Sequence, residues 1–304
     1  MHPALENITP KYNVAIKYED KKPPYPRDKI VLYSSRGCTN NCGYCAVPRL
    51  EGAMKSFKSI QHTLDAGRNE IPDAKSVVLY DNNFTEHEYF DDIVDELVNF
   101  GLPIDIHGLH VESFTEHHAK RLAELKWAGQ GKSGTPYLRF SFDKRKYYED
   151  IRRAAKLAAK YNIKPSFFCY MLFNFTDSPE DFWWRVAKTH DIVKETGKTI
   201  VLYPQRYEPL NSLKRNQYIG RKWTKEMARG LVRMYTHLHG FIPVTKNDNI
   251  FFWIGFSKNE FINKIKEMGK NKKLKRFEGD IIYEISCNLS QCKDIEDLKI
   301  YRSN

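Results

Sequence analysis

The sequence lacks the features that would place the protein in a membrane or outside the cell. It contains no run of about eighteen apolar residues, so it predicts no membrane-spanning helix. Its first residues, MHPALENITPKYN, lack the basic and then apolar layout of a secretion signal. With 304 residues, of which 41% are hydrophobic, the chain is long enough to bury one large core. We therefore expect a cytoplasmic protein with no membrane partner.

Cysteine is also scarce, and its distribution argues against a disulfide framework. Of the 6 cysteines in the chain, Cys38, Cys42 and Cys45 lie within one short stretch, RGCTNNCGYCAVPRLEG. Such clustering in a reduced protein favours metal chemistry over disulfide bridges. The remaining cysteines, whose spacing fits no cluster, are expected to be structural: Cys169, Cys287 and Cys292.

Strand-like runs alternate with helical patterns along most of the chain. The expected strands are 29–35, 76–83, 102–108, 137–143, 164–174 and 198–205. Each strand precedes an amphipathic helical pattern. Ser59 is a candidate N-cap of the first helix, and Gly129 is a candidate C-cap of the third. Ser178 and Pro179 are candidates for the N-cap and the first position of the fifth helix. Six such units predict a parallel sheet with right-handed crossovers, short of the eight units of a closed barrel. The expected fold is α/β, a partial (βα)6 barrel with a C-terminal extension.

The same patterns predict three segments. Residues 1–28 are proline-rich and form an irregular lead-in, residues 29–240 form the barrel, and residues 241–304 form a basic extension. The cysteine stretch follows the first expected strand, so it lies at the barrel mouth, where βα loops gather catalytic groups.

Three cysteines leave an iron–sulfur cluster with one iron that no protein ligand holds. A [4Fe–4S] cluster takes one thiolate per iron, so the last ligand would come from outside the protein. The alternative is a zinc site completed by one histidine, for which the candidate donors are His62, His107 and His110.

The spacing C-x3-C-x2-C after the first strand of a six-unit barrel, with Tyr44 just before the last cysteine, resembles the radical S-adenosylmethionine (radical SAM) superfamily along residues 29–210. The resemblance implies a [4Fe–4S] cluster on the three cysteines and SAM on the free iron. It also implies an enzyme in which an electron, delivered by a reductase, flavodoxin or ferredoxin, cleaves SAM to methionine and a 5′-deoxyadenosyl radical. That radical abstracts hydrogen from an unactivated carbon.

The resemblance further implies SAM contacts at the ends of later strands. Three polar residues follow the second strand, where the superfamily meets the SAM amino group: Asp81, Asn82 and Asn83. An Asx turn is the other interpretation of this stretch. Three more alternate on one face of the fourth strand, with the first suited to the methionine carboxylate and the others to ribose: Arg139, Ser141 and Asp143. Further candidate contacts are Tyr44, Gln205 and Arg206.

The segment after the cysteines bears on the substrate. Val47, Pro48 and Gly52 resemble the pattern C-x-x-C-x-[IV]-P-x(3)-G of methylthiotransferases acting on tRNA and ribosomal protein, and of cobalamin-type radical SAM enzymes. The short lead-in leaves no room for their N-terminal accessory domains, so we expect a barrel without them. The net charge of +11, partly carried by residues 258–276, attracts polyanions.

We therefore expect a radical SAM enzyme acting on a nucleic acid such as tRNA. The alternatives are a radical SAM enzyme acting on a small molecule or peptide, and a non-catalytic zinc module that binds RNA. Binding of RNA would weaken steeply with salt, whereas binding of a small molecule would not.

Overall fold

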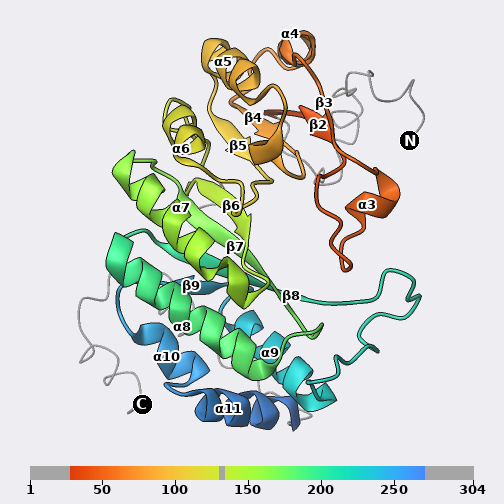
Figure 1. The fold of residues 1–304 in the computed structure, drawn as a ribbon, viewed down its shortest axis with the longest axis vertical. Coiled ribbons are helices and arrows are strands. Elements are labelled where there is room, and N and C mark those ends of the chain that lie inside the picture. Colours follow the sequence, from red (N-terminus) through yellow and green to blue (C-terminus); the bar gives the residue numbers. More distant parts are fainter. Residues whose placement is uncertain (1–27, 130–133, 271–304) are drawn as a thin grey trace. The chain divides into compact units, whose positions relative to one another are not determined.

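The computed structural model describes residues 28–129 and 134–270 (Figure 1). By their internal contacts these residues divide into two compact units. Of the described residues, the first unit holds 28–129, 134–142, 146–169 and 209–212, and the second holds 143–145, 170–208 and 213–270.

A parallel sheet of three strands forms the base of the first unit. Its strands are β1 (Lys29–Leu32), β4 (Ser76–Leu79) and β5 (Ile104–Ile106), in the order β1-β4-β5. The register pairs Val31 with Val78, and Val78 with Asp105. The helices that follow the strands are α4 (Gln61–Glu70), α5 (Phe90–Phe100) and α6 (Glu116–Leu122), with the short 3-10 helix η1 (Phe84–Glu86) before α5.

The two faces of this sheet differ in what covers them. Helix α4 packs on the face that carries Ile30, so closely that a Cβ on Gly67 would lie 2.6 Å from the Ile30 side chain. Because side chains alternate along a strand and partners in register share a face, Val31, Val78 and Asp105 lie on the opposite face. The next residues on that face, beyond the strand ends, are Tyr33, Tyr80 and His107.

Strand β6 (Tyr137–Ser141) begins a second sheet, with the order β6-β7-β8-β9. The boundary between the two units runs through β7 (Ser166–Phe173). Strand β8 (Ile200–Arg206) ends beside β7, since the Tyr207 N–H donates to the Phe173 carbonyl at 2.9 Å, and β9 (Ile242–Val244) pairs with β8 in the antiparallel direction. The remaining helices are η2 (Arg145–Tyr147), α7 (Tyr148–Lys160), α8 (Pro179–Thr196), α9 (Lys225–His237), α10 (Asn249–Ile254) and α11 (Lys258–Lys270).

The predicted partial barrel is confirmed in its order of elements. A strand begins within each of the six expected ranges, with β8 running one residue past the last of them, and a helix follows each strand. Ser178 caps α8 with Pro179 in its first turn, as predicted. Two predicted caps are wrong: Ile60 takes the N-cap position of α4, one residue after Ser59, and α6 ends at Leu122, seven residues before Gly129. The residues just before Gly129 lie beside β5 instead, where the Ala128 N–H donates to the Ile104 carbonyl at 2.9 Å.

Several elements escaped the sequence patterns. They are the strands β2 (Ser35–Arg36) and β3 (Lys55–Ser56), the four-residue helix α3 (Val47–Leu50), and β9, α10 and α11 in the predicted extension. Helix α11 packs against α9 closely enough that a Cβ on Gly230 would lie 1.7 Å from the Ile265 carbonyl oxygen. The predicted lead-in up to residue 27, the lysine-rich residues 271–276, Cys287 and Cys292 lie outside the described residues.

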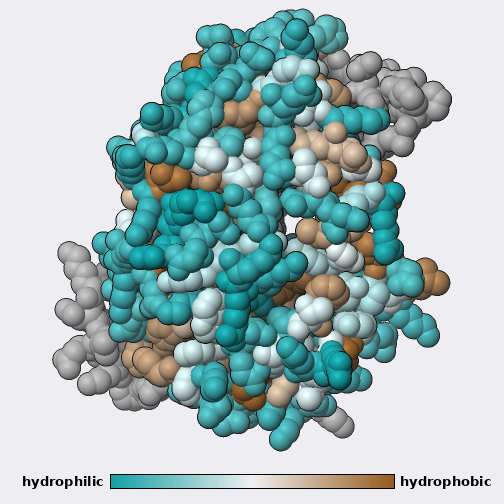
Figure 2. All heavy atoms as spheres, in the orientation of Figure 1, coloured by the Kyte–Doolittle hydropathy of each residue, from teal (hydrophilic) through white to brown (hydrophobic). Residues whose placement is uncertain are grey.

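The surface is predominantly hydrophilic on the face drawn in Figure 2, where apolar side chains form scattered small groups. Exposed large apolar residues include Leu50, Leu213 and Phe256. In the described parts of the chain, no helix has both the length and the apolar character needed to cross a bilayer.

Candidate active site

The three clustered cysteines lie on a loop closed by a small antiparallel hairpin. Strands β2 and β3 pair Ser35 with Ser56 and Arg36 with Lys55, which brings the two ends of the loop together. Gly37 starts the loop with a φ of 79°, and a Cβ there would lie 2.3 Å from the Ala53 carbonyl oxygen. Glycine is therefore required at this position, by both conformation and space.

Glu51 ties the beginning of this loop to its end. Its carboxylate accepts a hydrogen bond from the Gly37 N–H at 2.8 Å and forms an ion pair with Arg36 at 3.1 Å. Asn82, which follows β4, donates through Nδ2 to the same carboxylate at 3.1 Å and to the Gly37 carbonyl at 3.1 Å. One carboxylate thus fixes the cysteine loop to the carboxyl end of the neighbouring strand.

The three thiols are free and half-buried. Burial raises the pKa of the Cys45 thiol; the backbone N–H of Val47 opposes this effect, and the neighbouring Cys42 and Cys38 reinforce it. Among residues 28–129 and 134–270, no three His, Cys, Asp or Glu side chains are grouped tightly enough to hold a single metal ion.

Asp81 was expected to meet the SAM amino group, and its hydrogen bonds correct this prediction. Its side chain is buried, with 3% exposed, and accepts hydrogen bonds from the backbone N–H groups of Ser34 and Ser35 at 2.8 and 3.3 Å. Both serine hydroxyls also donate to it. Burial raises the pKa of Asp81, and these four donors partly offset the rise. Asp81 therefore holds the end of β1 against β4, through partners far along the chain rather than within an Asx turn.

The two asparagines that follow Asp81 differ in what they can still bind. Asn83 is 1% exposed and engaged at both ends, since Nδ2 donates to Thr39 at 3.1 Å and Oδ1 accepts from Thr85 at 2.8 Å. Asn82 uses its Nδ2 in the loop network, and its side-chain carbonyl remains available as an acceptor. The backbone of this stretch packs on Gly108, where a Cβ would lie 2.1 Å from the Asp81 carbonyl oxygen.

Arg139 was expected to bind the methionine carboxylate, but a carboxylate of the protein already occupies its guanidinium. It forms a buried ion pair with Asp105 on β5 and donates to the Ile106 carbonyl at 3.0 Å. Asp105 also accepts from His107 Nε2 at 3.1 Å. Burial alone would raise the pKa of Asp105, but His107 and Arg139 together lower it. The inward orientation predicted for Arg139 fits, because Asp105 lies on the face away from α4, but its role becomes structural.

The sequence presents His107 only as a candidate zinc donor, and its position in the structure indicates a different use. Its ring packs against that of Tyr80, with centroids 4.2 Å apart and planes tilted by 38°, and the rings of Tyr80 and Tyr33 have centroids 6.3 Å apart. The three side chains form a row across the carboxyl ends of β1, β4 and β5. Because Asp105 holds Nε2, it fixes the orientation of the ring and leaves Nδ1 for an external partner. Strand register would have revealed this row, since each residue follows its strand at the same position.

The other predicted residues have varied surroundings. Ser141 and Tyr44 are half-buried in the first unit. In the second unit, Asp143 accepts a hydrogen bond from the Leu172 N–H at 2.6 Å, and Gln205 is exposed. Arg206 donates to the Tyr218 carbonyl at 3.0 Å, within the loop that follows β8. Of the zinc donors considered, His62 is exposed on α4, and His110 lies between Glu86 and Glu112 at 3.4 and 3.5 Å.

A loop with three free cysteines, placed after the first strand of a partial βα barrel, offers the thiolate donors that iron–sulfur clusters use. Residues 32–183, half of the chain, match the family model of the radical SAM superfamily. The chain therefore belongs to the radical SAM superfamily. It is an enzyme of this class, and its cofactors are a [4Fe–4S] cluster and SAM. Membership of this family of enzymes argues against the alternative of a non-catalytic zinc module.

Solved structures of SuiB from Streptococcus suis resemble the chain at low identity. The free protein matches with 15% identity and a TM-score of 0.46, covering 70% of this chain and 46% of SuiB. The structure of SuiB bound to S-adenosylmethionine matches with 14% identity and a TM-score of 0.43, covering 75% of this chain and 49% of SuiB. The structure bound to the precursor peptide SuiA matches with 15% identity and a TM-score of 0.44, covering 89% of this chain and 69% of SuiB. The chain thus spans about half the length of the first two. No curated protein sequence matched it.

Proposed function

We propose that Cys38, Cys42 and Cys45 each bind one iron of the [4Fe–4S] cluster and that the protein uses it to functionalise a C–H bond. The observation that carries this proposal is the hairpin-closed loop with its three free, half-buried thiols. Thiolates are soft ligands that suit iron–sulfur clusters, so the donor set fits the cofactor. When bound, the cluster and SAM supply a 5′-deoxyadenosyl radical that can remove hydrogen from an unactivated carbon.

The groups proposed to orient SAM are fewer than the sequence indicated. The side-chain carbonyl of Asn82 is an acceptor for the amino group, beside the loop that it already anchors. Ser141 and Asp143 remain candidates for the ribose hydroxyls, with Tyr44 and Gln205 as further contacts. Asn83, like Asp81, is proposed to support the site rather than to contact SAM. Its hydrogen bond to Thr39 positions the segment between Cys38 and Cys42.

His107 is proposed as the residue that exchanges a proton with the substrate. Asp105 orients its ring through Nε2, and Nδ1 is left for the substrate at the carboxyl edge of the sheet. This arrangement of a carboxylate, an imidazole and a free ring nitrogen is the usual way in which a histidine is prepared for proton transfer.

The proposed substrate is a nucleic acid such as tRNA. Support comes from the net charge of +11 and from the resemblance of Val47, Pro48 and Gly52 to methylthiotransferases. The rival is a peptide or small molecule, and a peptide is what SuiB is seen to bind. A reductase, flavodoxin or ferredoxin would deliver the electron. Closely spaced free thiols suit a reducing compartment, so we propose a cytoplasmic location.

The test is anaerobic reconstitution with iron and sulfide, followed by dithionite and SAM. The measured quantities are iron and sulfide content and 5′-deoxyadenosine, for the wild type and for Cys42→Ala. We expect about four irons in the wild type, from the cluster stoichiometry, and loss of both cluster and product in the variant. Stimulation of 5′-deoxyadenosine by tRNA rather than by a peptide mixture supports the substrate class. A colourless protein holding zinc would refute the proposal.

A further inference from the structure

We propose that residues 213–222, here called the basic strap, bind the phosphate backbone of an RNA substrate together with the groove beside them. This inference rests on the nucleic-acid substrate proposed above. The strap follows β8 and leads into α9. Its sequence, LKRNQYIGRK, contains no acidic residue, and its cationic side chains are exposed: Lys214, Arg215, Arg221 and Lys222.

Three cations of the strap, Arg215, Arg221 and Lys222, contrast with the paired lysines of α8. Lys188 pairs with Asp191 at 2.7 Å, and Lys194 pairs with Asp248 at 3.0 Å. Over the described residues, in contrast, no carboxylate forms a salt bridge with Arg215, Arg221 or Lys222. Paired charges cancel at a distance, whereas these three contribute a positive field that attracts phosphates.

The backbone of the strap is anchored although its cations are exposed. Buried Asn174, at the end of β7, donates through Nδ2 to the Tyr218 carbonyl at 3.1 Å and accepts the Gly220 N–H at 2.8 Å. Arg206 donates to the Tyr218 carbonyl as well, at 3.0 Å. A Cβ on Gly220 would lie 2.8 Å from the Asn174 backbone, so the two segments touch. An anchored backbone loses less entropy when it binds a partner.

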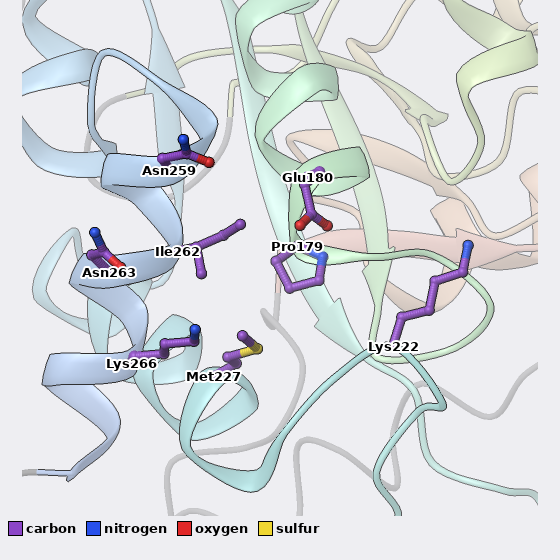
Figure 3. A pocket seen from close by; sticks show the side chains of 8 residues that line it. All are labelled: Pro179, Glu180, Lys222, Met227, Asn259, Ile262, Asn263 and Lys266. Carbon is purple, nitrogen blue, oxygen red and sulfur yellow. The ribbon is translucent and has the colours of Figure 1, made fainter.

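An open groove of about 430 Å³ continues the strap along α11 (Figure 3). On one side, α11 projects three polar side chains one or two turns apart: Asn259, Asn263 and Lys266. Lys222 stands on the other side, and Ile262 and Met227 line the groove between them. Amide and ammonium groups donate to phosphate oxygens, which is the commonest kind of contact between proteins and nucleic acids. Glu180 is the one carboxylate in the lining.

The spread of these donors favours an extended polyanion. A single phosphate or carboxylate would need the cations to converge on one point, whereas Arg215, Arg221, Lys222 and Lys266 are distributed along the strap and α11. Phosphates repeat at regular intervals along RNA, so one strand can meet several of these cations in turn. An acidic peptide carries charge less regularly, and it is the rival that the experiment must separate.

The experiment measures binding of a fluorescein-labelled tRNA to the reconstituted full-length protein, by anisotropy across a series of salt concentrations. The variant is Arg215→Gln/Arg221→Gln/Lys222→Gln. Its control is Arg152→Gln/Lys160→Gln/Lys188→Gln, which removes the same charge from cations that are paired with carboxylates. Iron content and melting temperature establish that each protein is folded. The single change Arg221→Glu serves if the triple variant is unstable.

We expect the strap variant to bind tRNA at least tenfold more weakly than the control, with a salt slope smaller by about 2 to 3 for three lost phosphate contacts. Equal affinity and slope in the two variants would overturn the inference while leaving the RNA substrate in place. Failure of the wild type to bind tRNA would overturn both. Strap-dependent binding of polyglutamate in preference to tRNA would assign the surface to an acidic peptide instead.

Discussion

Asp105 on β5 and Arg139 on β6 form an ion pair in which the side chains are only 2% and 4% exposed. The pair joins β5 to β6, and Asp105 also orients His107. Sequence patterns alone presented Arg139 as a SAM ligand. Its partner shows that the charge is used to build the site rather than to bind the cofactor.

Removing one member of this pair should destabilise the first unit strongly. Arg139→Met leaves the Asp105 carboxylate buried without its cation, and such a change typically costs about 3–5 kcal/mol. The double variant Asp105→Leu/Arg139→Met removes both charges and should recover much of the loss. Guanidinium denaturation under anaerobic conditions measures the free energy of unfolding of the single and the double variant. Equal loss of stability in the single and double variants would show that the ion pair itself does not stabilise the first unit.

Glu51 should determine how firmly the cysteine loop holds its cofactor. Glu51→Gln removes the charge that binds Arg36 and weakens the bond from the Gly37 N–H. Charge-assisted hydrogen bonds contribute about 1.5–3 kcal/mol, so iron loss to a chelator should be roughly tenfold faster. The readout is the decay of the cluster absorbance, with Asp73→Asn, an exposed change outside the loop network, as control. Identical decay in the two variants would refute this role.

Helix α6 should lose stability on mild acidification. His118 Nδ1 accepts the Thr115 N–H at 3.0 Å in a capping box, and this requires a neutral ring. Burial lowers the pKa of His118, with the charge of His117 acting in the same direction. A lowered folded-state pKa gives stability above the unfolded value of about 6.5 that is lost as the pH falls below it.

The measurement for this helix is thermal unfolding at pH 7.5 and 5.5. A broken cap costs about 0.5–1 kcal/mol. Glutamine at the same position of a capping box accepts the bond without titrating, so His118→Gln should flatten the pH dependence. An unchanged pH dependence in His118→Gln would place its origin in another group.

Gly108 should not tolerate even one added methyl group. Its missing Cβ would lie 2.1 Å from the Asp81 carbonyl oxygen and 2.7 Å from Asn82 backbone atoms. Backbone cannot move aside as a side chain does, so Gly108→Ala should cost about 1–3 kcal/mol. Because Asn82 anchors the cysteine loop, cluster content should fall too. Denaturation and iron analysis on the same samples check both, and wild-type values for both would contradict this packing.

The sequence by itself determined the order of strands and helices and the place of the cysteine loop. Alternation of β-branched runs with amphipathic runs is a local property, and so is the spacing of Cys38, Cys42 and Cys45. The cap at Ser178 and Pro179 was also predictable from the sequence, because a capping box involves only neighbouring residues. The short strands β2 and β3 were not, since two-residue strands leave no periodicity.

Tertiary structure alone decided which polar residues are free to bind. Asp81, Arg139 and Asn83 have the right chemistry for SAM, but each is held by a partner far along the chain: Ser34 and Ser35, Asp105, and Thr39 respectively. Strand register likewise brought Tyr33, Tyr80 and His107 into one row. A side chain's residue type fixes what it could bind, whereas its burial and its partners fix what it has left to offer, and these depend on contacts that no local pattern encodes.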